Sequence, residues 1–349
     1  MKVTMELKLL PNEQMAALLD FTMQEYISLI NDILDYAIAC CRMPKLSSAN
    51  LHAPLPSALR DQCRRDAKSI YDKVLKLGSK FNGKFPTLKK TVSIWNNQNY
   101  EVGTDYIAMP FFVNGKSRKM KIPAIVPNEA FKTLQSVKQG ALRVTQKGHK
   151  YIAQIAYEKA EAAPSKETKA MGVDLGLKCP AVAVFGDGKT KFYGNGRQSK
   201  FVRRKYSTRR KKLGKAKKLR AIQKSRNKEQ RWMRDQDHKI SRIIVNDAIS
   251  QKVGIIKLES LAGIRRSART SRKNNHSLHG WSFYRLASYI EYKAKLAGIE
   301  VKYVDPAYTS QTCPRCGNRH HAKDRQYVCP DCGYRCHRDR VGALNILNA

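Results

Sequence analysis

The stretch Lys169-Ala-Met-Gly-Val-Asp-Leu-Gly-Leu177 (KAMGVDLGL) sets one acid, Asp174, among small and apolar residues. A run of this kind is typical of a buried β-strand, here over Ala170–Leu175. Burying a carboxylate without a partner costs several kcal/mol, roughly 2–7 or more. We therefore expect Asp174 to have a partner that compensates this cost.

Two other acids stand in similar settings. Glu259 ends the apolar stretch GIIKLE, and this stretch predicts a short buried strand over Gly254–Ser260. Asp339 opens the stretch DRVGALNIL, which predicts the last helix. Because Asp339 also fits a simple helix cap, no single acid decides the fold.

The order of the three acids is more informative. Strands expected at Ala170–Leu175, Ala181–Phe185 and Lys191–Tyr193 form a meander. An acid in its first strand, one at the end of a later strand and one at the start of the last helix match an RNase H fold, which brings three such carboxylates together. They could bind two Mg²⁺ ions, one activating water and the other stabilising the leaving oxygen of a phosphodiester. The metal charge would then compensate the burial of Asp174.

The sharpest local signal is CPRCGNRHHAKDRQYVCPDCG, which contains two C-x-x-C-G knuckles separated by twelve residues. Each knuckle directs two thiolates at one point, so together they predict a closed, structural Zn²⁺ site. A redox role for either C-x-x-C is the alternative. The predicted ligands are Cys313, Cys316, Cys329 and Cys332. We expect the neighbouring candidates to be bystanders, although one could compete as a ligand: His320, His321, Cys336 and His337.

The charge of the chain indicates its partner. Its 349 residues carry 67 Lys and Arg against 28 Asp and Glu, a formal net charge of +39 at pH 7. Such a charge destabilises a compact chain by self-repulsion unless polyanions are bound. The sequence has no apolar run long enough to span a bilayer and no lipidation motif. We therefore expect nucleic acid, and no membrane, as the partner.

Eleven of these positive charges fall in RRKYSTRRKKLGKAKKLR (Arg203–Arg220), within a basic helical region expected from about Ser199 to Ser250. With this density no helix face is free of positive charge, so we predict phosphate contacts; a solvated charge run is the alternative. The predicted contact residues are Arg203, Arg204, Lys205, Arg209, Arg210, Lys211, Lys212, Lys215, Lys217, Lys218 and Arg220. Arg265, Arg266, Arg269, Arg272 and Lys273 extend the basic surface into a loop.

The N-terminal half changes texture along its length. Alternation over Lys2–Leu9 predicts a half-buried strand, and the apolar face that follows, from Glu13 to Ala37, predicts a long helix. A second, basic helix is expected over Ser57–Leu77, and short strands from Thr91 to Tyr157. The polar segment Glu158–Lys169 predicts a linker between domains.

The first ten residues intersperse charges among apolar side chains, so we expect no signal peptide and a cytoplasmic, reducing environment. There the nine cysteines are not expected to form a disulfide framework. Four of them are expected to be core or surface thiols: Cys40, Cys41, Cys63 and Cys179.

With these residues the chain resembles the TnpB family, the RNA-guided nucleases encoded by some insertion sequences. It is similar also to the compact type V CRISPR effectors related to TnpB. The motifs GVDLG, IKLESL and RQYVCPDCGYRCHRD carry the resemblance and match Asp174, Glu259 and Asp339. The resemblance covers residues 170–349 by motif and residues 1–165 only in layout.

Two details of the last motif need comment. The family's Arg just before the second knuckle falls on Arg325, and the resemblance implies a place near the scissile phosphate. After the third acid the family usually shows Asn two residues on and then two alanines. Val341, Gly342 and Ala343 stand there instead, which leaves the proposed metal ligand unchanged.

The resemblance implies an α/β protein of several domains: a wedge-like β-barrel from residues 1–10 and 91–165, a helical recognition lobe over 11–90, and an RNase H-like RuvC domain over 166–349 with a zinc ribbon at about 309–336. It implies a guide RNA, a double-stranded DNA target, and Mg²⁺- or Mn²⁺-dependent cutting of both strands at one site, in a nucleoid-associated prokaryotic protein. A catalytically silent RNA-guided repressor and a DNA transposase with an RNase H core are the alternatives.

Overall fold

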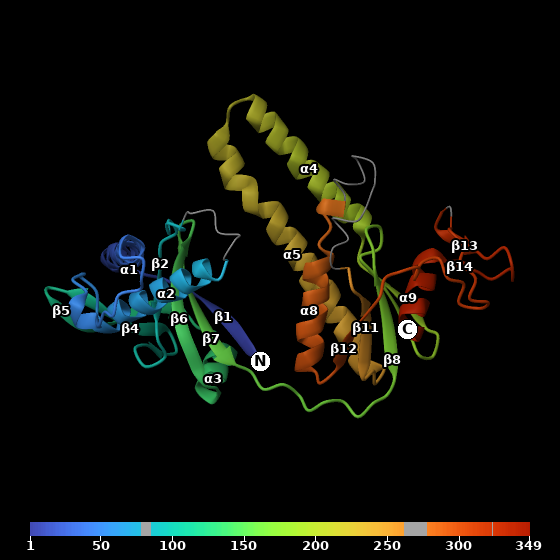
Figure 1. Cartoon of the computed structure of the whole chain (residues 1–349), viewed down its shortest axis with the longest axis horizontal. Helices are drawn as coiled ribbons and strands as arrows, with labels where there is room; N and C mark the ends of the chain where they lie inside the picture. Colours follow the sequence, from blue (N-terminus) through green and yellow to red (C-terminus); the bar gives the residue numbers. More distant parts are fainter. Residues whose placement is uncertain (78–84, 262–277, 323) are drawn as a thin grey trace. The chain divides into compact units, whose positions relative to one another are not determined.

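The computed structural model describes residues 1–77, 85–261, 278–322 and 324–349. These residues form two compact units, Met1–Lys159 and Ala160–Ala349 (Figure 1). The predicted basic loop from Arg265 to Lys273 lies outside the described residues. No helix in the described part of the chain is long and apolar enough to cross a membrane.

The first unit is built on a seven-stranded sheet with the order β2-β6-β7-β1-β5-β4-β3. Its paired strands are all antiparallel, and the N-terminal strand lies in the middle, between β7 and β5. The strands are β1 (Lys2–Leu9), β2 (Val92–Trp95), β3 (Glu101–Val102), β4 (Tyr106–Val113), β5 (Lys116–Ile125), β6 (Gln139–Lys147) and β7 (Lys150–Glu158).

Two long helices pack on this sheet. They are α1 (Glu13–Ala39) and α2 (Ser57–Leu75), close to the predicted bounds. The Tyr26 hydroxyl of α1 donates a 2.8 Å hydrogen bond to Asp66 of α2. The apolar residues of both helices and of the strands form one core that includes the fully buried Trp95.

Two short helices of this unit were not predicted. They are η1 (Ser48–Asn50), between α1 and α2, and α3 (Asn128–Ser136), within the region where only strands were expected. Within α3 the one buried residue is Leu134, so the helix leaves little apolar periodicity in the sequence.

The second unit contains a five-stranded sheet with the order β10-β9-β8-β11-β12. As predicted, β8 (Ala170–Leu175), β9 (Ala181–Phe185) and β10 (Thr190–Tyr193) form an antiparallel meander. β11 (Ile255–Glu259) and β12 (Glu300–Val304) run parallel to β8. The carboxyl ends of β8, β10, β11 and β12 therefore lie at one edge of the sheet.

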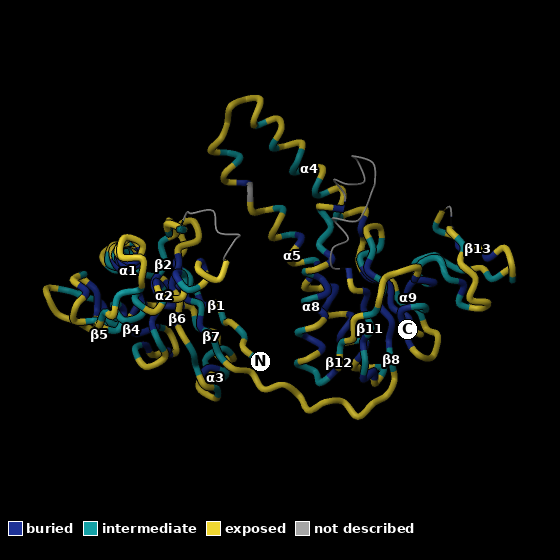
Figure 2. Tube along the Cα trace, in the orientation of Figure 1, coloured by how far each residue is buried: buried dark blue, intermediate teal, exposed yellow. Residues whose placement is uncertain are grey.

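Helices cover both faces of this sheet. α5 (Leu219–Ser250) and α8 (Phe283–Leu296) share an apolar core with one face, to which Ala183 of β9 contributes. The residues on either side of it, Val182 and Val184, belong to a second cluster with α9 (Arg338–Asn348) on the other face. Figure 2 shows the central strands largely buried. Burial on both faces explains the uninterrupted apolar run of β9.

α9 approaches β8 most closely at Gly172. A Cβ at this position would lie 2.3 Å from the carbonyl oxygen of Ala343 and 2.5 Å from the backbone nitrogen of Leu347. Only glycine fits this approach without a backbone shift. The close contact holds the first turn of α9 beside the end of β8.

The basic helical region is a hairpin of two helices, α4 (Gly196–Lys215) and α5. The Asn195 side chain caps α4 by accepting hydrogen bonds from the backbone N–H groups of Arg197 and Gln198. Lys217, in the turn between the helices, has a φ of +53°, which the sequence does not signal with a glycine. Figure 1 shows the two helices side by side.

The predicted ribbon contains a two-stranded antiparallel pair, β13 (Gln326–Val328) and β14 (Arg335–His337). Tyr327 is fully buried in its small core, and its hydroxyl donates a 3.2 Å hydrogen bond to the carbonyl oxygen of Gln311. This bond ties the strand pair to the segment that enters the first knuckle.

Candidate functional site

The three predicted acids come from three elements of the second unit. Asp174 lies near the end of β8, Glu259 is the last residue of β11, and Asp339 is in the first turn of α9. In the parallel register of β8 and β11, Leu258 lies opposite Val173. The next residues on the two strands are therefore adjacent, and α9 adds the third acid because it packs on β8.

The electrostatics of Asp174 show that the other two acids lie close enough to affect it. Burial raises the pKa of Asp174 well above its usual value, and the negative charges of Glu259 and Asp339 raise it further. The positive charges of Arg338 and Arg325 lower it in part. Ionising Asp174 beside the other two carboxylates is therefore costly, and a bound cation would offset that cost.

Gly342 leaves the space that Asp174 occupies. A Cβ at position 342 would lie 3.1 Å from Oδ2 and 3.2 Å from Cγ of Asp174. The TnpB resemblance predicts alanine at position 342. An alanine Cβ would come too close to the Asp174 carboxylate unless one of the two groups shifted. Glycine at position 342 therefore accommodates the Asp174 carboxylate without a shift of either group.

Glu259 is held by a residue that the sequence analysis did not select. The Thr309 hydroxyl donates a hydrogen bond to the Glu259 carboxylate. Burial raises the pKa of Glu259, and this hydrogen bond opposes the rise. The Asn345 side chain of α9 donates 2.7 Å hydrogen bonds to the carbonyl oxygens of Thr309 and Thr312 and so fixes the loop. The sequence contains no local signal for these contacts, which join distant segments.

Arg325 forms an ion pair with Asp339, in which one guanidinium nitrogen contacts both carboxylate oxygens. The cap of α9 is His337, whose Nδ1 accepts a 3.3 Å hydrogen bond from the backbone N–H of Asp339. The interpretation of Asp339 as a simple helix cap is therefore wrong. Its carboxylate faces Arg325 and the other acids instead.

The four predicted cysteines converge. Their Sγ atoms all lie within 4.8 Å of one another, and Cys313–Cys332 and Cys316–Cys329 are each separated by 3.6 Å. Four thiolates at about 2.3 Å from a tetrahedral zinc would lie about 3.8 Å apart. The cluster therefore has the spacing of a four-thiolate metal site.

Each knuckle turns at its glycine. Gly317 and Gly333 have φ values of +77° and +69°, which glycine adopts without strain. The N–H of each glycine donates a hydrogen bond to the carbonyl oxygen of the first cysteine of its knuckle. The neighbouring candidates do not belong to the cysteine group: His320, His321, Cys336 and His337.

The carboxylates are more widely spaced than the thiolates. Among the described residues, only the four cysteines bring three or more such ligand atoms within 4.8 Å of one another. Carboxylate oxygens suit hard cations such as Mg²⁺ and Mn²⁺. A wider set of three fits two ions, which lie roughly 3.5–4 Å apart in two-metal sites, better than one compact cage.

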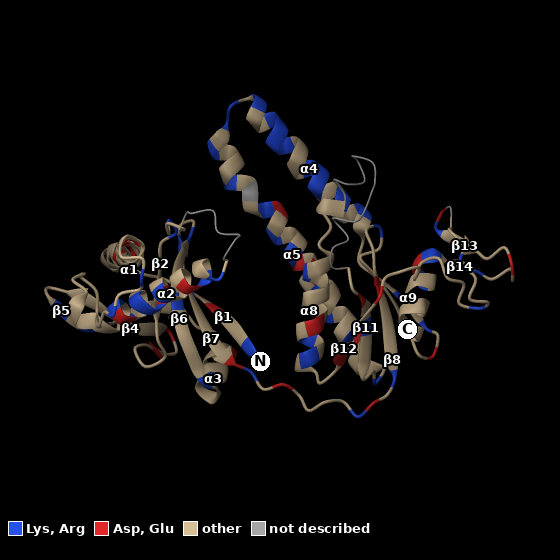
Figure 3. Cartoon of the chain, in the orientation of Figure 1, with Lys and Arg blue, Asp and Glu red and all other residues tan. Residues whose placement is uncertain are grey.

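The predicted basic residues follow α4 and the turn into α5. Arg203 and Arg210 are partly buried, whereas the other nine are exposed. Arg210 pairs at 2.7 Å with Glu229 of α5, so its charge is used within the hairpin. Figure 3 shows the remaining positive charge distributed along α4 and the turn. Contact with nucleic acid at this surface stays a prediction.

Comparison with known proteins places these features in a family. Residues 283–346 match the family of the Cas12f1-like TNB domain. The chain is 34% identical over 128 residues to a TnpB-like protein of Methanocaldococcus jannaschii, a match that covers 36% of this chain and 46% of that protein. It is 31% identical over 195 residues to the CRISPR-associated endodeoxyribonuclease Cas12f1 of Sulfoacidibacillus thermotolerans, which covers 51% and 45%.

The chain is similar to TnpB-like and Cas12f proteins. The resemblance stated from the motifs is therefore confirmed. The chain spans a little under half the length of the two relatives named above.

A solved structure shows the same fold. The Cas12f1 chain in a complex described as Cas12f1, sgRNA and target DNA superposes with a TM-score of 0.72 at 16% identity. The match covers 97% of this chain and 83% of that chain. It confirms the α/β fold class of this chain and the likeness of its fold to Cas12 effectors.

Proposed function

We propose that this protein is an RNA-guided DNA endonuclease with one cleavage site, formed by Asp174, Glu259 and Asp339. The observation that carries the proposal is the convergence of these acids from three elements, where Glu259 and Asp339 make ionisation of Asp174 more costly. The names of the relatives support it, because one is an endodeoxyribonuclease and the matching structure contains guide RNA and target DNA.

The second unit would be an RNase H-like RuvC domain over residues 166–349. Three features support this: a meander in the order β10-β9-β8, two parallel strands that continue the sheet, and a last helix that packs on β8. This arrangement puts one acid on the first strand of the meander, one at the end of β11 and one on α9.

Asp174, Glu259 and Asp339 would hold two Mg²⁺ or Mn²⁺ ions, as their donor type and spacing allow. When bound, these ions activate a water molecule and stabilise the leaving oxygen of a phosphodiester. Thr309 keeps the Glu259 carboxylate oriented through its hydrogen bond. Arg325, paired with Asp339, would contact the scissile phosphate.

Zn²⁺ would occupy the four-cysteine site and hold the ribbon together. With four protein ligands the site leaves no position for a substrate, so its role would be structural. The loop that carries Thr309 leads into the ribbon. The Asn345 side chain anchors this loop through a hydrogen bond. Folding of the ribbon would therefore also place the residue that orients Glu259.

The guide RNA would be held by basic surfaces that include α4, since these supply phosphate contacts without reading sequence. In the first unit, residues 1–10 and 91–165 would be the wedge-like barrel. The recognition lobe, residues 11–90, would be a layer of two helices that shares one core with the sheet. Pairing between guide and target would supply sequence specificity.

A catalytically silent repressor would not need all three acids, and all three are present and clustered. The test is a guide-programmed plasmid cleavage assay beside an RNA-binding assay. Asp174→Asn, Glu259→Gln and Asp339→Asn should each lower the cleavage rate of both strands by roughly 10²-fold or more. RNA binding should stay nearly unchanged, and EDTA should stop cleavage by the unaltered protein.

Asp187→Asn is the matched control, because Asp187 is an exposed acid in the β9–β10 turn of the same sheet. It should cleave at the normal rate. Near-normal cleavage by Asp174→Asn would refute the cleavage site. Equal loss of binding and cleavage in all three variants would show a structural role for the acids instead.

A further inference from the structure

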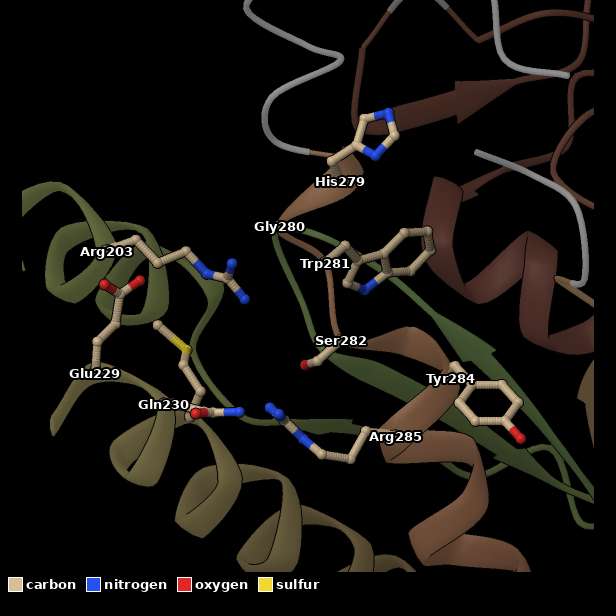
Figure 4. Close-up of a pocket in the computed structure, with 10 residues that line it drawn as sticks. Arg203, Glu229, Gln230, His279, Gly280, Trp281, Ser282, Tyr284 and Arg285 are labelled. Atoms are coloured by element: carbon tan, nitrogen blue, oxygen red, sulfur yellow. The ribbon is translucent and has the colours of Figure 1, made fainter. Parts of the chain in front are cut away.

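A pocket of about 410 Å³ lies between α4, α5 and the segment that begins α8 (Figure 4). Arg203, Glu229, Trp281 and Arg285 are among the residues that line it. None of these residues belongs to the acid cluster. Apart from Arg203, none was selected from the sequence.

The pocket lies at the functional edge of the sheet. α4 follows the carboxyl end of β10, so it starts at the edge where β8 and β11 also end. α8 runs back to the amino end of β12, so its first turn starts at that same edge. Asp174 and Glu259 lie at this edge too, at the ends of β8 and β11. The pocket and the acids therefore lie at the same edge of the sheet.

The negative charges of Glu229 and Asp237 favour the charged form of Arg203, but each of these acids forms its ion pair with another arginine. Arg285 pairs at 2.6 Å with Asp237, and Glu229 pairs at 2.7 Å with Arg210. Arg203 makes no hydrogen bond or ion pair with any residue that the structure describes, although it is partly buried. Burial lowers the pKa of Arg203, but a guanidinium stays charged near neutral pH. Figure 4 shows this guanidinium pointing into the pocket, where it would attract an anion.

An aromatic ring and hydrogen-bonding groups share the pocket with Arg203. The half-buried indole of Trp281 lines it and packs against Phe283, with ring centroids 5.1 Å apart. In Figure 4 the Ser282 hydroxyl lies between the indole and the Arg285 guanidinium, and the Gln230 amide lies beside that guanidinium. An aromatic face, an arginine and polar groups are the parts that a site for one nucleotide requires.

We propose that this pocket binds one nucleotide of single-stranded DNA, with its base stacked on Trp281 and its phosphate on Arg203. The pocket volume is in the range of small-ligand sites, roughly 300–1,000 Å³, and suits one unit of a strand. An unpaired nucleotide is required, because neighbouring bases cover the faces of a base in a duplex. The inference rests on the proposed function, since it is the DNA strand that the acids would cut.

Photo-crosslinking tests the stacking. The probe is a short oligothymidylate that carries one 5-iodouracil, and the protein is the full chain. Peptide mass spectrometry should locate the crosslink at Trp281. Trp281→Phe should keep the probe in place, with a crosslink at position 281. Trp281→Leu, which keeps an apolar side chain without an aromatic face, should abolish it.

Affinity measurements distinguish the contribution of the base to binding from that of the phosphate. Trp281→Leu should weaken binding of the oligothymidylate by roughly 5- to 150-fold but leave binding of an abasic oligonucleotide unchanged. Arg203→Gln should weaken binding of both and reduce the salt slope by about 0.7. Arg234→Gln, at an exposed arginine of α5 outside the pocket lining, should leave the Trp281 crosslink intact.

Three results would overturn the proposal: a crosslink elsewhere, equal oligothymidylate binding by Trp281→Leu and the unaltered protein, or an effect on oligouridylate only. The last result would assign the pocket to RNA. None of these measurements requires cleavage. A protein that crosslinks at Trp281 but never cuts would refute the nuclease proposal alone, and a nuclease without this crosslink would refute the pocket alone.

Discussion

The ammonium group of Lys293 donates a 2.6 Å hydrogen bond to the hydroxyl of Ser241, inside the interface between α8 and α5. It also donates a 2.7 Å bond to the carbonyl oxygen of His238, and Lys293 is only 3% exposed. Burial, together with the positive charge of Arg242, lowers the pKa of Lys293 to about 8. This buried amine gives the second unit a pH-dependent stability.

The folded state releases the Lys293 proton near pH 8, whereas the unfolded chain holds it until about pH 10.5. The contribution of Lys293 to the free energy of unfolding therefore rises as the pH increases through that window. Lys293→Met removes this contribution, so the gain in stability between about pH 7 and about pH 10 should be smaller in the variant. Urea unfolding at both pH values measures it. Lys295→Met, at an exposed lysine of α8, is the control, and an equal gain in Lys293→Met and this control would contradict the prediction.

Thr309→Val removes the hydroxyl that orients Glu259 and keeps the shape of the side chain. We expect cleavage to fall by roughly 10- to 150-fold, because one hydrogen bond to a charged group contributes roughly 1.5–3 kcal/mol. RNA binding should not change, and Thr309→Ser should restore most of the rate. Thr312→Val is the matched control. Thr312 lies in the same loop, and its hydroxyl donates only to the backbone carbonyl oxygen of Tyr308. Normal cleavage by Thr309→Val would remove this residue from the site.

The purified protein should contain about one zinc per chain. Replacing Cys313 and Cys316 by Ser removes two of the four thiolates, so metal analysis should show loss of the zinc and the ribbon should fold poorly. Cys40→Ser, at an exposed cysteine outside the cluster, should keep the metal. Full zinc content in the double variant would refute the four-cysteine assignment.

The protein should copurify with RNA, and the affinity should fall steeply as salt rises. Replacing Arg209, Lys211 and Lys212 by Ala removes three exposed charges of α4 while keeping the Arg210–Glu229 pair. The salt slope should flatten by roughly two to three. Exchanging Arg and Lys at the same three positions keeps the charge and should keep the slope. An unchanged slope in the alanine variant would place the phosphate contacts elsewhere.

Features that depend on neighbouring residues could be predicted from the sequence. β8, β9 and β11 are buried on both faces or nearly so, and they appear as apolar runs, in two of which, β8 and β11, one acid stands out. The cysteine site depends on two tight knuckles, and the C-x-x-C-G spacing of each can be recognised directly in the sequence. Asp174 could be selected for the same reason. The free-energy cost of burying its carboxylate is apparent from the apolar residues next to it in the sequence, even though its partners are distant.

Features that depend on tertiary contacts could not be predicted. Thr309 and Glu259 are fifty positions apart in the chain, and nothing near either residue indicates the bond between them. His337 was expected to be a bystander and is a helix cap, because imidazole is a less usual cap than Asp, Ser or Thr. The break after Lys215 lacks a proline and has a lysine at positive φ, which propensity disfavours.

The segment between the two units is attached at both ends. Lys159 exchanges backbone hydrogen bonds with Met1, whereas the N–H of Ser165 donates a 2.8 Å bond to the carbonyl oxygen of Gly298 and Lys169 accepts a 2.9 Å bond from Gly254. The chain can therefore be divided into two separately expressed polypeptides after Lys159 without breaking these bonds. A division at Lys169, which the polar composition of the segment would suggest, would remove from the second polypeptide the backbone of Ala163–Glu167, which lies directly against Gly254 and Gly298.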